Sequence, residues 1–184
     1  MYALFEEIGE FLNESPKCGS THILTIDGRA GSGKTTFAAA LAHYLARKNQ
    51  VQILHLDDIY SGWESALGPK LTQTLESIRK SLSSGESIEL PIFNWGTNSF
   101  DSIRKIAPCD ILIIEGVGSG QKILRSAAKT SIWLDIDAQE GLARVLERDG
   151  KQIESHMSAW QKSEEEHFAQ EKTREFAEFI IATE

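Results

Sequence analysis

Two kinds of hydrophobic pattern alternate along the chain. Short continuous apolar runs are typical of buried strands, and apolar residues that recur every three or four positions are typical of helices. The runs predict strands at residues 22–26, 51–56, 110–114 and 131–136, with a last one at 179–182. The helical pattern covers residues 1–15, 33–48, 69–83, 139–149 and the Glu-rich tail from residue 155 on.

Strands that alternate with helices favour βαβ units and a parallel sheet. The run at residues 110–114 is almost wholly apolar, as expected for a strand that is buried on both faces. The sequence therefore predicts a three-layer α/β fold, with a parallel sheet and helices on both faces, in a single domain of 184 residues. In such sheets ligands bind beyond the carboxyl ends of the strands, so chemically active residues should follow them.

The first predicted strand leads into a phosphate-binding motif. Residues 28–35, Gly-Arg-Ala-Gly-Ser-Gly-Lys-Thr, fit the pattern G-x-x-x-x-G-K-[ST] and open a helix. Glycines let backbone amides wrap around phosphates, and the helix N-terminus adds partial positive charge. We expect a P-loop NTPase fold that binds a nucleoside triphosphate, with the Thr35 hydroxyl on Mg²⁺. The expected nucleotide-binding residues are Gly28, Arg29, Ala30, Gly31, Ser32, Gly33, Lys34, Thr35 and Thr36.

Acidic residues close the second and third predicted strands. Asp57 and Asp58 follow residues 51–56, where a carboxylate would face the γ-phosphate and could serve as a base or as a metal ligand. Glu115 follows residues 110–114, as in a Walker B strand, where an acid holds Mg²⁺. We expect Thr35, Asp57 and Glu115 around the metal. The alternative for Asp57 and Asp58 is a solvated acidic turn that caps the next segment, and for Glu115 it is a buried or capping residue without a metal.

Two arginines share one face of the predicted helix at residues 139–149. Arg144 and Arg148 could close over the phosphates, because phosphoryl transfer benefits from mobile positive groups near the transferred phosphate. The alternative is an ion-paired helix surface, with Glu140, Glu147 or Asp149 as partners.

Composition narrows the set of partners. The formal net charge of −8 argues against broad nucleic-acid binding, and no apolar run is long enough to span a membrane. The N-terminal residues lack the basic start and the cleavage site of a secretory signal. Cys18 and Cys109 match no metal or redox spacing, which favours free thiols in a reducing cytoplasm. The sequence is compatible with a homo-oligomer.

Taken together, the motifs resemble a known family. The chain resembles the uridine kinase and phosphoribulokinase branch of the P-loop kinases in five segments: residues 26–36, 55–60, 113–116, 142–144 and 148–149. The tail is similar to a poorly characterised bacterial subgroup of that branch. The resemblance implies an ATP- and Mg²⁺-dependent kinase with a lid at about residues 139–160. It also implies that Asp57 is the base acting on the acceptor hydroxyl, with Lys34, Arg144 and Arg148 stabilising charge.

The acceptor side departs from the family pattern. The family segment Pro-x-Tyr-Asp-Phe is matched by residues 91–95, but Phe93 and Asn94 replace its Tyr and Asp. Asn98 stands where the uridine enzymes usually have a histidine, and Gly141 and Val145 stand where lid arginines are often found. The expected substrate-binding residues are Asp58, Tyr60, Trp63, Phe93, Trp95 and Asn98, of which Trp63, Phe93 and Trp95 could instead pack in the core.

Three functions are compatible with these residues. The first is a kinase for a hydroxyl group of a small molecule, a nucleoside above all. The second is a nucleoside monophosphate kinase, disfavoured because residues 59–100 offer only Lys70, Arg79 and Lys80 to hold an acceptor phosphate. The third is a regulatory NTPase that transfers phosphate to no acceptor. His167 and the acidic run 164–166 are expected on a solvated helix surface.

Overall fold

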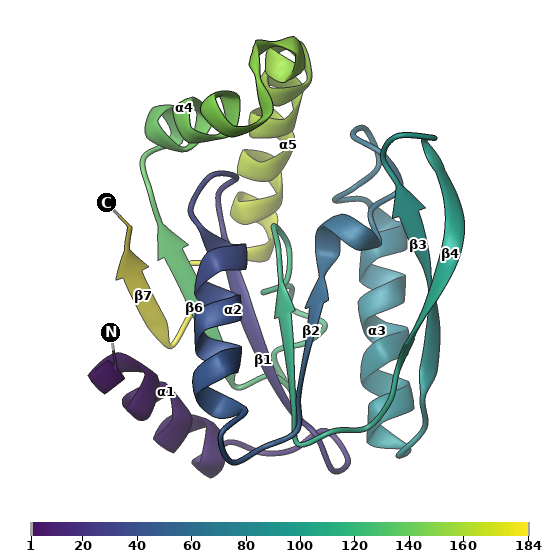
Figure 1. Ribbon diagram of the computed structural model, residues 1–184, viewed down its shortest axis with the longest axis vertical. Coiled ribbons are helices and arrows are strands. Elements are labelled where there is room, and N and C mark those ends of the chain that lie inside the picture. Colours follow the sequence, from purple (N-terminus) through teal and green to yellow (C-terminus); the bar gives the residue numbers. More distant parts are fainter. Residues whose placement is uncertain (1, 184) are drawn as a thin grey trace.

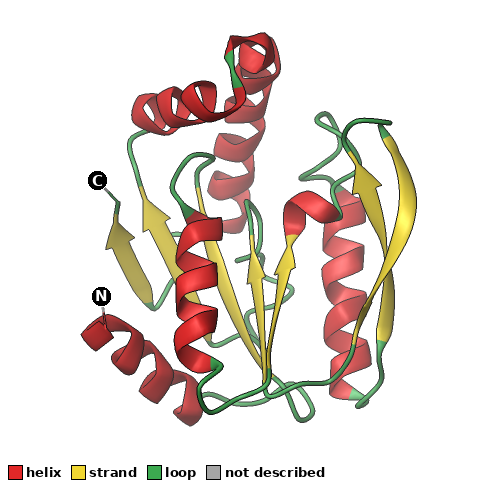
Figure 2. Cartoon of the chain, viewed as in Figure 1, coloured by secondary structure: helices red, strands yellow, loops and turns green. Residues whose placement is uncertain are grey.

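The sheet at the centre of the molecule has five parallel strands. Residues 2–183 are described by a computed structural model, and Figures 1 and 2 show its arrangement. The order across the sheet is β2-β5-β1-β6-β7, and every neighbouring pair is parallel. The strands are β1 (His22–Gly28), β2 (Val51–His55), β5 (Ile111–Glu115), β6 (Thr130–Asp135) and β7 (Phe179–Ala182).

Alternating side chains of each strand enter the two cores on opposite faces of this sheet. Ile111 and Ile113 of β5 pack with α1 (Tyr2–Glu14) and α2 (Lys34–Leu45). Leu112 and Ile114 pack on the other face with α3 (Pro69–Ser83). Because side chains alternate across a strand, an apolar run such as β5 supplies both cores at once. The predicted three-layer α/β fold is therefore confirmed, and the predicted strands lie within two residues of their expected bounds.

A second, two-stranded sheet was not predicted from the sequence. Strands β3 (Ile88–Asn94) and β4 (Ser99–Ile106) pair antiparallel, with an irregularity between Ile92 and Phe93. This hairpin lies beside α3 on the right of Figure 1, apart from the main sheet. Most side chains of β4 are exposed, and the hairpin joins the core mainly through Leu90 of β3 and Ile106 of β4.

The remaining elements lie over the carboxyl ends of the strands. Figure 1 shows α4 (Ala138–Asp149) and the start of α5 (Glu154–Glu171) beyond the arrowheads of the central strands. The short helices η1 (Leu56–Asp58) and η2 (Lys151–Ile153) follow β2 and α4. No helix within residues 2–183 is long and apolar enough to cross a membrane.

We predict that α1 unfolds together with the sheet. Ile8 is 0% exposed and packs in the core that α1 shares with α2. Ile8→Ala should therefore lower the free energy of unfolding by about 2–5 kcal/mol, through lost burial and the remaining cavity. The exposed Glu10, on the same helix, is the matched control, and Glu10→Ala should change it by no more than about 0.5 kcal/mol. Urea denaturation measures both; equal values for the two variants would mean that α1 is not part of the cooperative core.

Candidate functional site

A cleft of about 680 Å³ opens at the carboxyl ends of the strands. It brings together the P-loop, the ends of β2 and β5, α4, α5 and the turn of the β3–β4 hairpin. Its lining includes Ala30, Gly31, Gly33, Lys34, Thr35, Thr36, Asp57, Tyr60, Trp63, Trp95, Glu115, Arg144, Arg148, Met157 and Trp160. Most of the predicted site residues, which are far apart in the sequence, therefore share one cleft.

The P-loop lysine is turned back onto its own loop. Lys34 Nζ donates to the backbone oxygens of Gly28 at 2.8 Å and Arg29 at 2.7 Å. Burial lowers the pKa of Lys34, and the carboxylates of Asp27 and Glu115 oppose that shift. The ammonium group of Lys34 is thus held at the P-loop by two backbone carbonyl oxygens, and phosphate oxygens could take their place.

The start of the P-loop is anchored by a buried acid that the sequence analysis did not single out. Asp27 Oδ1 accepts the N–H groups of Gly28 at 2.8 Å and Gly118 at 3.0 Å, and Oδ2 accepts Gly120 N–H at 2.9 Å. Gly118 and Gly120 belong to the segment that follows β5. One carboxylate therefore fixes the P-loop relative to the strand end that carries Glu115.

Side-chain oxygens that could bind a metal lie side by side at the start of α2 and the end of β5. Thr35 Oγ1 donates to Glu115 Oε1 at 3.0 Å, and His55 Nδ1 lies 2.5 Å from the same oxygen. The hydrogen bond to Glu115 raises the pKa of His55. Within residues 2–183 no three His, Cys, Asp or Glu side chains are grouped closely enough to hold a metal by themselves. This donor set fits Mg²⁺, which commonly takes one or two protein oxygens together with substrate phosphates.

Asp57 lies at the end of β2 and faces the cleft. Its carboxylate is open to the cleft but surrounded by protein on its other sides. This desolvation raises the pKa of Asp57, and Glu115 raises it further, whereas Lys34 and Arg148 lower it. The position and the raised pKa suit a general base, because a more basic carboxylate accepts a proton more readily.

The structure shows the ion-paired form of the two arginines that are expected to form the lid. Arg144 and Arg148 line the cleft, and each is also paired with a neighbour on α4. Arg144 Nη2 contacts Glu140 Oε1 at 2.5 Å, and Arg148 donates twice to Asp149, at 2.7 and 2.6 Å. The guanidinium groups would have to leave these exposed partners to bind phosphates. That exchange is inexpensive, since exposed ion pairs contribute little stability.

Three of the predicted substrate-binding residues lie elsewhere. Tyr60, Trp63 and Trp95 line the cleft, and Asp58, Phe93 and Asn98 do not. Asp58 lies 3.6 Å from Arg104 Nη1 of β4, and Phe93 is buried within the hairpin. Asn98 has φ 51° in the β3–β4 turn, a left-handed conformation that Asn adopts more readily than most residues. In this structure Asp58 therefore contacts the hairpin, and Phe93 and Asn98 are part of it.

Aromatic rings form one wall of the cleft, which we call the aromatic wall: Tyr60, Trp63, Trp95 and Trp160. Trp63 meets Trp95 and Trp160 edge to face, with centroids 5.1 and 5.8 Å apart, and stacks on His156 at 5.5 Å. Several polar atoms of this wall are already bonded. Tyr60 donates to Val117 O and Trp95 Nε1 donates to Asp57 O.

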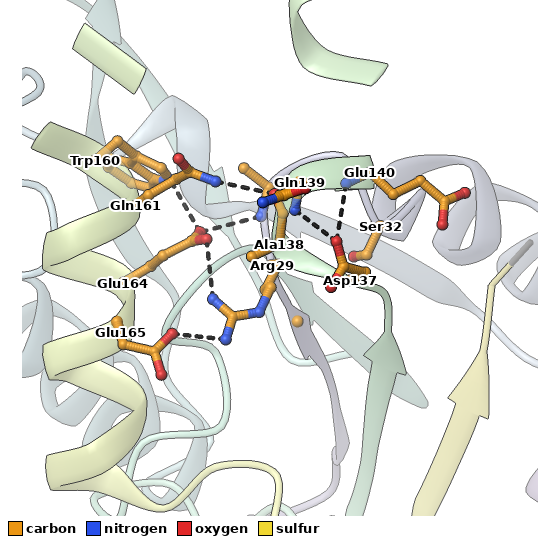
Figure 3. Close-up of polar contacts among 12 residues, drawn as sticks. Arg29, Ser32, Asp137, Ala138, Gln139, Glu140, Trp160, Gln161, Glu164 and Glu165 are labelled. Atoms are coloured by element: carbon orange, nitrogen blue, oxygen red, sulfur yellow. Dashed lines mark hydrogen bonds and ion pairs between the residues drawn. The ribbon is translucent and has the colours of Figure 1, made fainter. Parts of the chain in front are cut away.

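The structure corrects part of the expectation of a solvated surface on α5: Glu165 and Glu166 are exposed as expected, but two other residues of this segment are not. Glu164 and His167 are buried, at 1% and 8% exposure, on the face of α5 that also carries Met157 and Trp160. Figure 3 shows Glu164 directed at the P-loop together with Arg29. The Arg29 side chain pairs with Glu165 at 2.6 Å and points toward α5, and Arg29, although predicted to bind nucleotide, does not line the cleft.

The P-loop also packs tightly against α4. Gly31 has φ 81°, and a Cβ there would lie 2.2 Å from the carbonyl oxygen of Gly141. A Cβ on Gly141 would lie 2.6 Å from the carbonyl oxygen of Ala30. This close backbone contact explains why position 141 is a glycine and not an arginine, because any side chain there would displace α4 from the P-loop.

A P-loop at the end of the central strand of a parallel sheet, with acids closing two neighbouring strands, defines a P-loop kinase fold. The chain belongs to the phosphoribulokinase / uridine kinase family, whose sequence model matches residues 65–176. A second model, described as novel STAND NTPase 3, matches residues 7–75, which include the P-loop. The expected family is thus confirmed, and the chain belongs to a class of phosphotransferases.

Individual relatives and solved structures are similar to this chain at low sequence identity. A uridine kinase of Staphylococcus aureus is 25% identical, over 88% of this chain and 87% of the relative. A protein of Bacillus stearothermophilus described as a possible uridine kinase superposes with a TM-score of 0.67 at 21% identity, over 97% and 99% of the two chains. Shikimate kinase of Acinetobacter baumannii gives 0.52 at 18% identity, over 90% and 86%.

We predict that Gly141→Ala weakens both the fold and nucleotide binding. At an exposed helical position, Gly→Ala should stabilise by about 1 kcal/mol. Here the added Cβ would lie 2.6 Å from Ala30 O, so we expect a net loss of about 1–3 kcal/mol from overpacking. Thermal unfolding and calorimetric titration with Mg·ATP measure the two effects. Glu147→Ala, an exposed change on the same helix, is the control, and a stabilised Gly141→Ala protein would contradict this packing.

Proposed function

We propose that this protein is an ATP-dependent kinase that transfers the γ-phosphate to a hydroxyl group of a small uncharged acceptor, with a nucleoside as the first candidate. The observation that carries this proposal is the composition of one cleft. Its phosphate-binding end holds the P-loop, Thr35 and Glu115, and its other end is the aromatic wall. Asp57 lies in the same cleft, as a base between donor and acceptor must.

The donor half would hold Mg·ATP. The P-loop amides and Lys34 would bind the phosphates, with Lys34 exchanging its backbone partners for phosphate oxygens. Thr35 and Glu115 would hold Mg²⁺, and Asp57 is the third metal ligand expected from the sequence. When bound, this ion neutralises charge on the β- and γ-phosphates. The 3.0 Å contact between Thr35 and Glu115 supports their assignment as a pair.

Asp57 would act as the base on the acceptor. Its carboxylate takes the proton of the acceptor hydroxyl while that oxygen forms a bond to the γ-phosphorus. The bond from this phosphorus to the β–γ bridging oxygen breaks, and ADP leaves. The raised pKa of Asp57 favours this role, since a stronger base accepts the proton more readily.

Positive charge near the transferred group would come from α4. Arg144 and Arg148 line the cleft and could turn from Glu140 and Asp149 toward the phosphates. In this proposal residues 139–160 act as a lid within a single kinase domain. Stabilising charge that develops in the transition state is where such groups contribute most.

The acceptor half argues for an uncharged molecule. Among the described residues that line the cleft, the cations are Lys34, Arg144 and Arg148, and all three belong to the P-loop or to α4. The aromatic wall adds none. A nucleoside monophosphate kinase would need further cations there to hold the acceptor's own phosphate, so this second candidate is disfavoured. Rings of the wall suit the flat face of a base or another apolar ring.

We predict that Asp57→Asn lowers kcat by about 100-fold or more, the usual contribution of a positioned base. In the wild-type protein, kcat/KM should fall as the pH is lowered through the pKa of Asp57, because protonation removes the base. Desolvation and Glu115 place this fall above the ordinary aspartate pKa of 3.8. Steady-state rates with the acceptor found by screening, measured across pH, check both effects.

The neighbouring aspartate provides a matched control for the base. Asp58 has the same charge but lies outside the cleft, beside Arg104. Asp58→Asn should therefore keep a turnover close to wild type, and the fall at low pH should move only slightly to lower pH, because Asp58 is the smallest of the causes that raise the pKa of Asp57. Full turnover in Asp57→Asn would sink the proposed mechanism.

We predict that the acceptor is recognised through the aromatic wall. Unphosphorylated nucleosides should be better acceptors than nucleoside 5′-monophosphates or free ribose in a screen with labelled ATP. Trp63→Ala should raise the acceptor KM by about 5- to 150-fold, the equivalent of one lost stacking contact of 1–3 kcal/mol. Affinity for Mg·ATP should change little.

The control for this variant is Ile103→Ala. Ile103 is a large apolar side chain of β4 that is 69% exposed and lies outside the cleft, so its loss should leave the acceptor KM unchanged. ADP release without any acceptor is measured in parallel. If the protein hydrolyses ATP but transfers phosphate to no nucleoside, sugar or alcohol, the result would instead favour a regulatory NTPase. The match of residues 7–75 to an NTPase model is relevant to this alternative.

A further inference from the structure

A buried carboxylate on α5 takes no part in the proposed reaction. Glu164 is 1% exposed, although it stands in a run of three glutamates that looks solvated in the sequence. Burying a carboxylate is costly unless it is paired and hydrogen-bonded, so its partners should show what it does.

The two groups that donate hydrogen bonds to this carboxylate belong to residues that line the cleft. Glu164 Oε2 accepts the backbone N–H of Ala30 at 3.1 Å and the indole Nε1–H of Trp160 at 3.1 Å. Figure 3 shows the side chain of Glu164 reaching from α5 toward Ala30 and Arg29. A single oxygen atom thus holds the P-loop and a ring of the aromatic wall together.

Trp160 carries this connection into the acceptor end. Its ring lies 5.7 Å from that of Tyr60 and 5.8 Å from that of Trp63, measured between centroids. A shift of the Trp160 indole would therefore move or release both neighbours. Ala30, at the other end, is followed directly by Gly31, the residue whose backbone packs against α4.

The charge of Glu164 is also compensated from the P-loop. Arg29 Nη1 lies 3.6 Å from Glu164 Oε1. Burial raises the pKa of Glu164, and the Ala30 N–H, Lys34 and Arg29 oppose that shift. Anionic phosphates would draw Lys34 toward themselves and so change the field at this carboxylate. Filling the phosphate site should then be felt at Trp160.

We propose that Glu164 is a positioning residue that couples the P-loop to the aromatic wall through its Oε2 atom. Occupation of the phosphate site then adjusts the Trp160 ring, and an acceptor that packs on this ring adjusts the P-loop in return, because coupling between two sites is reciprocal. The use of the wall by an acceptor rests on the function proposed above; the link between the P-loop and Trp160 does not.

The test follows the tryptophans directly. The chain has four of them, so protein labelled with 5-fluorotryptophan should give four ¹⁹F resonances, and Trp160→Phe identifies that of Trp160. The probe is the non-hydrolysable ATP analogue AMP-PNP with Mg²⁺. In the wild-type protein its titration should shift the Trp160 resonance. In Glu164→Ala the shift should fall to less than half, although AMP-PNP still binds.

Two further variants separate this role from a purely structural one. Glu164→Gln keeps an oxygen that can accept both N–H groups, so its Trp160 response should lie closer to wild type than that of Glu164→Ala. Glu165→Gln removes the exposed ion pair with Arg29 but leaves Glu164 in place, and its response should equal wild type. Thermal unfolding of each variant establishes that it is folded; a change in melting temperature alone would not alter the resonance shift.

If Glu164→Ala does not fold, Trp160→Phe tests the same bridge from its other end, because phenylalanine keeps a ring but has no N–H. The shift of the Trp63 resonance with AMP-PNP should then be reduced. A Trp160 resonance that moves as far in Glu164→Ala as in wild type, or equal responses in Glu164→Gln and Glu164→Ala, would overturn the coupling. Binding of AMP-PNP that leaves Trp160 unmoved in wild type would overturn the coupling alone, whereas no binding at all would overturn the proposed function as well.

Discussion

The three backbone N–H groups that converge on the carboxylate of Asp27 set the geometry of the whole cleft. They come from Gly28, at the start of the P-loop, and from Gly118 and Gly120, after β5. With this anchor in place, Thr35 and Glu115 meet at hydrogen-bond distance, and the loop is fixed well enough for α4 to approach it through Gly141. Because unpaired amides and a lone buried carboxylate are both costly, these contacts hold or fail together.

Most of the fold could be predicted from the sequence, because buried parallel strands are continuous apolar runs. Strands β1, β2, β5, β6 and β7 all have this signal. The β3–β4 hairpin does not. Pro91 lies within β3, which tolerates a proline because it is an edge strand, and β4 is largely exposed and so has no apolar pattern to detect. Strands held mainly by each other and by one helix leave little trace in a hydrophobic pattern.

The phosphate-binding end was readable because its residues are contiguous and their spacing has a mechanical reason. The acceptor end could be predicted only in part. Phe93 is buried in the hairpin and Asn98 adopts a left-handed turn conformation, so neither lines the cleft. The burial of Glu164 and His167 was not predicted, because a buried polar side chain needs partners. Such partners, like the backbone of Ala30 for Glu164, can lie far away in the sequence. The spacing of Met157, Trp160, Glu164 and His167 on one helical face was the available signal.

The separation of the hairpin from the main sheet bears on how this chain could diverge. Within residues 2–183 the two sheets share no strand pairing, and Trp95, in the turn of the hairpin, donates to the carbonyl oxygen of Asp57. Substitutions, insertions or deletions in β3 and β4 can therefore reshape the aromatic wall without disturbing the strand order that supports the P-loop. Natural selection could in this way change the molecule that is modified while the energy source stays the same.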